Sequence, residues 1–178
     1  MENKAKRLLR FQQNPPIEII ETLLNSIDNH FNREIEKVAE QEIWLFVMLG
    51  IHAVSLTITE SIFNKRGLDG FKFFLENFID KNEEGFIFSE IAEKIHNWRN
   101  IIAHQWLSTS GYDFGLDFDM PKGWENRGGI TYFNPKLYYQ AFKESFSSGG
   151  KIWKYSDLLS EEEAEQAKLR MLEKYQNR

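Results

Sequence analysis

The stretch IWLFVMLGIHAVSLTI, residues 43–58, is the longest apolar run of the chain, and it decides the fold. A membrane-spanning helix needs about 20 predominantly apolar residues, whereas this run is shorter and contains Gly50, His52 and Ser55. We therefore predict a helix over residues 41–64 that forms the buried centre of a helical bundle. A membrane-spanning segment is the alternative.

Amphipathic helices are predicted on both sides of this central helix. After Pro16, apolar residues recur every three or four positions and so share one face: Ile17, Ile20, Leu24, Ile27 and Phe31. Ser89 is the expected N-cap of a later helix. The predicted helices cover residues 3–13, 16–38, 68–80, 89–107 and 135–146, and one more begins at a capping box formed by Ser160 and Glu163.

A change of period after Gly111 indicates a short β segment. Residues 112–119, YDFGLDFD, alternate between apolar side chains and acids or glycine, as a half-buried strand does. Residues 120–129 contain one proline and three glycines and are predicted to form a loop. The expected partner strand covers residues 129–133, so the sequence predicts a β-hairpin.

These patterns together predict a mainly α protein with two parts. Residues 1–110 are expected to form a helical bundle of four to five helices. Residues 111–178 add the β-hairpin and the C-terminal helices, which pack on the bundle to give a single compact unit. A chain of 178 residues with 15% aromatic residues can bury a sizeable hydrophobic core.

Composition restricts the chemistry and the setting. The chain has no cysteine, which excludes disulfide frameworks, thiolate metal sites and a cysteine nucleophile. The first 14 residues lack the apolar core of a signal peptide, and we expect a cytoplasmic protein. The net charge of −5 argues against tight, non-specific binding of long RNA, although a catalytic site needs only a few local phosphate contacts.

One segment carries residues suited to catalysis. Residues 96–106 read HNWRNIIAHQW, and on a helical wheel their apolar members continue a core-facing stripe that starts before them. His96, Asn100 and His104 fall on the far side at intervals of four, and Arg99 lies on the shoulder between the two faces. Arg99 carries the only formal charge between residues 95 and 112. We therefore expect an electropositive groove that binds an anion.

These residue types fit cleavage of RNA without a metal ion or a cofactor. Histidine exchanges protons near neutral pH, and arginine stays charged and offers a fork of donors to phosphate oxygens. We assign His104 as general acid or base, Arg99 as phosphate clamp and Asn100 as the orienting group. The 2′-hydroxyl would attack the adjacent phosphodiester while Arg99 stabilises the charge on the pentacoordinate phosphate.

The same segment resembles the HEPN superfamily, whose members carry an arginine, four to six further residues and a histidine near the end of a helical bundle. An Asn, Asp or His usually follows the arginine. The pattern maps onto Arg99, Asn100 and His104, and residues 16–108 are the matching region. The resemblance implies a homodimer in which two such helices build an RNA-cleaving cleft. It also implies roles in toxin–antitoxin, phage-defence or RNA-processing systems, with an antitoxin or defence protein as a partner.

Three functions remain open on the sequence. The first is a metal-independent endoribonuclease. The second is a non-catalytic HEPN-like module that binds a nucleotide, RNA or a protein, because some members of the superfamily are non-catalytic. The third is a helical interaction protein in which Arg99 and His104 form a structural polar pair.

Other polar residues have simpler interpretations. His52 is expected to be a buried or interface histidine, and His96 a satisfied surface histidine; in the alternative interpretation both face the same cleft as Arg99. The acidic residues that alternate after Gly111 would suggest a metal site, but the outer face of a strand explains them: Asp113, Asp117 and Asp119.

Overall fold

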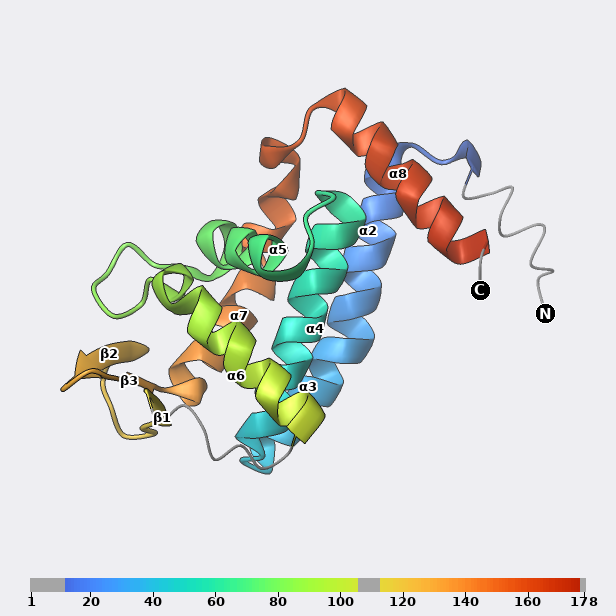
Figure 1. Cartoon of the computed structure of the whole chain (residues 1–178). Coiled ribbons are helices and arrows are strands. Elements are labelled where there is room, and N and C mark those ends of the chain that lie inside the picture. Colours follow the sequence, from blue (N-terminus) through green and yellow to red (C-terminus); the bar gives the residue numbers. More distant parts are fainter. Residues whose placement is uncertain (1–11, 106–112, 177–178) are drawn as a thin grey trace.

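The fold is mainly helical, as the sequence predicts, and the described residues also form one small three-stranded sheet (Figure 1). The computed structural model describes residues 12–105 and 113–176, without the side chains of residues 100–105, 175 and 176. The elements before the sheet are α2 (Pro16–Ser26), the π-helical η1 (Ile27–Asn32), α3 (Arg33–Glu40), α4 (Trp44–Ile62), α5 (Gly67–Phe74), the π-helical η2 (Leu75–Ile79), the 3₁₀-helical η3 (Phe88–Ile91) and α6 (Ala92–Gln105). They are followed by β1 (Phe114–Leu116), β2 (Trp124–Arg127), β3 (Ile130–Phe133), α7 (Pro135–Phe146), the 3₁₀-helical η4 (Lys151–Leu158) and α8 (Glu161–Gln176). The helix predicted for residues 3–13 falls almost entirely outside the described residues.

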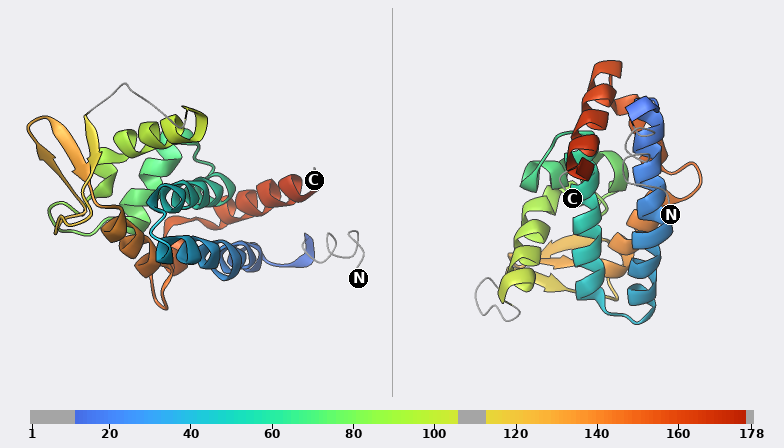
Figure 2. Two further views of the ribbon diagram at one scale, coloured as in Figure 1. Left: turned by 90° about the horizontal axis from the view of Figure 1, so that it is seen from below. Right: turned by 90° about the vertical axis from the view of Figure 1, so that its right-hand side faces the viewer.

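Helix α4 is the centre of the core, which confirms the prediction made from the apolar run. Val47, Ile51, Ile58 and Ile62 have no exposed surface, and α3, α5, α6, α7 and α8 all contact α4 (Figure 2). By length and composition α4 is also able to cross a membrane, but core helices pass the same test, and 56% of its most apolar window is buried inside the protein.

The helix predicted for residues 16–38 is continuous but contains a π-helical turn. Ile20, Leu24 and Ile27 are buried as predicted, whereas Phe31 is 61% exposed. A π-helical turn contains more residues than an α-helical turn, so it changes which residues after it face the core. The next buried residue after Ile27 is therefore Ile35, which is 7% exposed.

The sheet differs from the predicted hairpin. Its strand order is β1-β3-β2, with β2 antiparallel and β1 parallel to β3. Gly128 and Gly129 connect β2 to β3 and have φ values of +59° and +87°. A two-residue turn with two positive φ values favours a tight hairpin, so residues 124–127, which were predicted to be a loop, are the hairpin partner of β3. The strand predicted for residues 112–119 is shorter than expected and covers only β1, residues 114–116. It pairs with the other edge of β3.

The start of α6 also differs from the prediction. Ser89 lies inside the 3₁₀-helix η3 and does not cap it. Its hydroxyl and its backbone N–H both donate to the carboxylate of Asp80, which follows η2. The predicted N-cap is therefore wrong, and the aspartate anchors this end of the helix to the preceding segment.

Helix α8 begins at the predicted capping box and packs against the C-terminal end of α4. The Glu163 N–H donates to Ser160 Oγ over 3.3 Å, and the Ser160 N–H donates to Glu163 Oε2 over 2.8 Å. Further along α8, Arg170 donates from Nη2 to the Ile62 carbonyl over 2.7 Å and from Nε to the Ser61 carbonyl over 3.3 Å. The last carbonyls of a helix lack hydrogen-bond partners within it. Arg170 supplies these partners for two carbonyls at the end of α4.

Replacing Tyr138 by phenylalanine is expected to raise the free energy of unfolding by about 1 kcal/mol. Tyr138 is 1% exposed, and its hydroxyl has no hydrogen-bond partner among the described residues. Burial raises the pKa of this hydroxyl far above its ordinary value. Removing a buried, unpaired polar group removes its desolvation cost. Urea unfolding measures the change.

The matched control is Tyr155→Phe. The Tyr155 hydroxyl donates to the Ile17 carbonyl over 3.4 Å, so its removal should give no gain in stability. A Tyr138→Phe protein that unfolds more easily than wild type would contradict the prediction.

Candidate functional site

The candidate site lies where α6 crosses α4 and α5. Helix α6 runs in the opposite sense to α4, so its C-terminal end lies toward the start of α4 (Figure 1). Ile91 and Ile95 are buried, and the Trp98 ring packs against Phe114 with 5.6 Å between ring centroids. The apolar stripe predicted for this helix is confirmed for these three residues, and it fixes how α6 is rotated against the core.

A pair of histidines joins the two helices. His52 of α4 is 1% exposed, and its Nε2 lies 2.9 Å from Nδ1 of His96 on α6, within one hydrogen bond. The His52 ring also packs on Phe71 of α5, with 4.5 Å between centroids. His52 Nδ1 is buried and has no hydrogen-bond partner among the residues that the structure describes. The pair is therefore held by one shared hydrogen bond and by aromatic packing.

The electrostatics keep both histidines uncharged at neutral pH. Burial lowers the pKa of His52 to about 3, and the charges of Arg99 and His96 act in the same direction. Burial, followed by the charge of Arg99, also lowers the pKa of His96 below its ordinary value. The charge of Arg99 thus adds to burial in disfavouring a positive charge on either imidazole.

The structure places the predicted site residues on one helix but describes only one of their side chains. Arg99 is half-buried on α6, one turn after His96. The backbones of Asn100 and His104 belong to α6, and their side chains lie outside the described part. The juxtaposition of Arg99 with His104 therefore stays a prediction.

The histidine pair goes beyond what the helical wheel predicts. His52 is buried, as expected from its place in the apolar run. His96, predicted on the far side of α6 as a surface residue, instead contacts the buried His52. The one signal in the sequence was that a histidine inside an apolar helix needs a buried hydrogen-bond partner, but it does not specify which residue that partner is.

The acidic residues after Gly111 form ion pairs. Lys94 Nζ lies 2.9 Å from Asp113 Oδ2, and Arg127 Nη1 lies 2.8 Å from Asp117 Oδ2. Within residues 12–105 and 113–176, no group of three His, Asp or Glu side chains is arranged to hold a metal ion. Ion pairing thus accounts for Asp113 and Asp117. All three acids, Asp119 included, lie outside β1, so they do not form the outer face of a strand as predicted.

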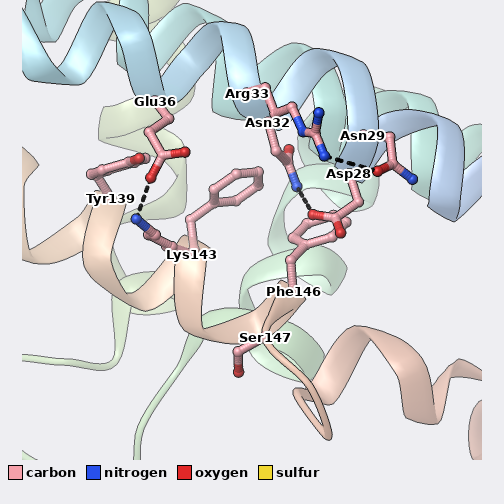
Figure 3. A pocket seen from close by; sticks show the side chains of 10 residues that line it. Asp28, Asn29, Asn32, Arg33, Glu36, Tyr139, Lys143, Phe146 and Ser147 are labelled. Carbon is pink, nitrogen blue, oxygen red and sulfur yellow. Dashed lines mark hydrogen bonds and ion pairs between the residues drawn. The ribbon is translucent and has the colours of Figure 1, made fainter.

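A separate hollow of about 280 Å³ lies between η1, α3 and α7 (Figure 3). Its charged and amide side chains are directed at one another. Glu36 pairs with Lys143, and Asn32 donates to Asp28 over 3.1 Å. Most of these polar groups thus bind one another, although Asn32 Oδ1 is buried without a hydrogen-bond partner among the described residues.

Comparison with known proteins gives no relative to guide the assignment. No protein-family model, no curated protein and no solved structure matches this chain. The functional argument therefore depends on the residues of α4 and α6 themselves.

Proposed function

We propose that this protein is a metal-independent endoribonuclease of the HEPN type. The observation that carries the proposal is the contact of His96 with His52 one turn before Arg99 on α6, where the charge of Arg99 lowers the pKa of both imidazoles. A fixed positive charge next to neutral hydrogen-bonding rings suits a phosphodiester, which is anionic and accepts hydrogen bonds.

In the proposed reaction, Arg99, Asn100 and His104 each have one role. His104 takes the proton of the 2′-hydroxyl, whose oxygen then forms a bond to phosphorus while the bond to the 5′-oxygen breaks. The leaving 5′-oxygen receives a proton from water, and Arg99 stabilises the charge that develops on the phosphate. Asn100 orients the imidazole. The products are a 2′,3′-cyclic phosphate and a 5′-hydroxyl.

The proposal includes a cytoplasmic homodimer that works in a toxin–antitoxin or phage-defence system, with an antitoxin or defence protein as a partner. Apolar side chains on the surface favour an interface near the start of α4. Ile43 and Leu45 are 45% and 36% exposed, and the C-terminal end of α6 lies toward this region (Figure 1). A second copy that covers them would bring two α6 helices close together.

The test is to incubate purified protein with mixed RNA in EDTA and to map the ends of the products. We expect cleavage by the wild-type protein, with 2′,3′-cyclic phosphate ends. Arg99→Ala should reduce the rate about 100- to 1,000-fold, the usual cost of losing a group that stabilises developing charge. His104→Ala should reduce it at least as strongly, because it removes the proposed acid or base.

The controls are Arg33→Ala and His30→Ala, which remove the same residue types from exposed positions on η1 and α3. Both should cleave RNA at the wild-type rate. Cleavage that persists undiminished in Arg99→Ala and His104→Ala would show that the site is assigned wrongly.

The net charge of −5 favours a second candidate, a non-catalytic module that binds a nucleotide, RNA or a protein. This candidate predicts a folded protein that does not cleave RNA under the same conditions. It also predicts ligand binding that Arg99→Ala weakens, whereas a purely structural role for Arg99 predicts a change in stability alone.

A further inference from the structure

The hydrogen bond between His52 and His96 has a direction that the surroundings determine. Two neutral imidazoles that share one hydrogen bond place one proton between them, so one ring donates and the other accepts. If His52 accepted at Nε2, its own proton would sit on Nδ1. That atom is buried without a partner among the described residues, and unpaired buried N–H groups are rare because they are costly. His52 therefore donates from Nε2.

This direction fixes the tautomer of His96. Its Nδ1 accepts the hydrogen bond from His52, so the neutral ring carries its proton on Nε2. The two nitrogens of an imidazole point to different sides of the ring, and Nε2 consequently points away from the buried partner. His96 is only partly buried, which leaves this N–H within reach of a ligand.

We propose that His96 Nε2–H and the Arg99 guanidinium together bind a phosphate group, and that His52 is the positioning residue that holds His96 in the donating tautomer. The inference rests on the proposed function in that the phosphate is taken to be that of an RNA phosphodiester. It gives His96 a role distinct from that of His104: His96 donates a hydrogen bond to a phosphate oxygen and takes no part in proton transfer.

The pair also keeps His96 from acting as a base. A second proton on His96 would have to sit on Nδ1, and His52 would then have to accept and move its own proton to the buried Nδ1. The positive charge of Arg99 opposes the same step. Among the described side chains, Arg99 therefore supplies a permanent positive charge and His96 a neutral donor, which complement the charge and the acceptor oxygens of a phosphate.

The test is long-range ¹H–¹⁵N NMR of the histidine rings in the full chain, with inorganic phosphate as the probe. We expect His52 and His96 each to carry a single proton on Nε2. Phosphate should shift the His96 signals in a saturable manner. Arg99→Gln should weaken this binding about tenfold, equivalent to one charge-assisted contact. The exposed His30 is the internal reference, and Arg33→Gln, which removes an exposed arginine elsewhere, should bind phosphate as the wild type does.

Two variants of His52 test whether this residue positions His96 or only supports the fold. His52→Phe removes the donor, so His96 should exchange between tautomers and bind phosphate several-fold more weakly. His52→Gln keeps an amide donor of similar reach and should restore both the single tautomer and the binding. If neither variant folds, the tautomer in the wild type and the effect of Arg99→Gln still decide the matter.

The inference is overturned if His96 carries its proton on Nδ1, if phosphate leaves its signals unchanged, or if Arg99→Gln binds as tightly as the wild type. RNA cleavage measured on the same samples separates this result from the proposed function. Phosphate binding at His96 without cleavage supports the inference and contradicts the nuclease. Cleavage without a phosphate response at His96 supports the nuclease and overturns the inference.

Discussion

Lowering the pH from about 7.5 to about 5 is expected to cost the protein about 2 kcal/mol of stability through His52 alone. The pKa of this histidine is lowered from 6.5 to about 3 in the folded protein, so the unfolded chain binds a proton that the folded protein does not. Protonation then favours unfolding as the pH falls below about 6.5, and the loss continues until about pH 3. The lowered pKa of His96 acts in the same direction.

Urea unfolding at the two pH values measures this loss, and His52→Phe isolates its source. A phenylalanine can occupy the same place beside Phe71 but cannot take up a proton. The variant should therefore lose about 2 kcal/mol less than the wild type over the same pH range. The control His30→Gln, at an exposed position, should behave as the wild type does. An equal loss in wild type and His52→Phe would show that other groups cause the acid sensitivity.

Gly150→Ala is expected to lower the free energy of unfolding by about 3 kcal/mol or more. A Cβ atom at this position would lie 2.3 Å from the Ser145 carbonyl oxygen and 2.6 Å from that of Glu144. Both oxygens belong to the backbone of the last turn of α7, so neither can rotate away as a side chain would. The substitution must separate α7 from η4, and chemical denaturation measures the resulting loss.

The neighbouring Gly149 is the matched control. It has a positive φ of +77° but open space around the position of a Cβ atom. Gly149→Ala should cost only the strain of the left-handed conformation, about 1–2 kcal/mol. A larger loss in the free energy of unfolding for Gly149→Ala than for Gly150→Ala would contradict the prediction, because it would show that the close backbone oxygens at Gly150 are not the stronger constraint.

Much of the helical framework can be predicted from the sequence because each helix has a clear apolar period. The apolar run at residues 43–58 becomes the buried α4, and the boundaries of α7 match those expected from Pro135 and Phe146. Asn134 explains the match at the start of α7, since its side chain accepts hydrogen bonds from the first amides of this helix. Local chemistry therefore determines where α7 begins.

The pairing of the strands could not be predicted in the same way. Alternation shows that a segment is a strand, but it does not show which neighbour the strand joins. Residues 114–116 and 130–133 are both strands as expected, but they are parallel and not joined in a hairpin. The π-helical turn at residues 27–32 also has no signal in the apolar spacing, and only the exposure of Phe31 reveals its effect.

The candidate site could be predicted only in part. The residue types on α6 indicate an anion site, which stays a prediction, and the charge of Arg99 lowers the pKa of His52 and of His96. The contact between His52 and His96 joins positions 44 residues apart, and no local pattern specifies how two distant helices are rotated against each other. Packing of Ile91 and Ile95 sets this rotation.

The contact of Arg170 with the end of α4 has a consequence for protein synthesis. The Ile62 carbonyl receives its hydrogen bond from a residue 108 positions later in the chain. Until the segment that contains Arg170 has been synthesised, the Ile62 carbonyl lacks this partner. The end of α4 is therefore completed only once α8 has been made and has docked.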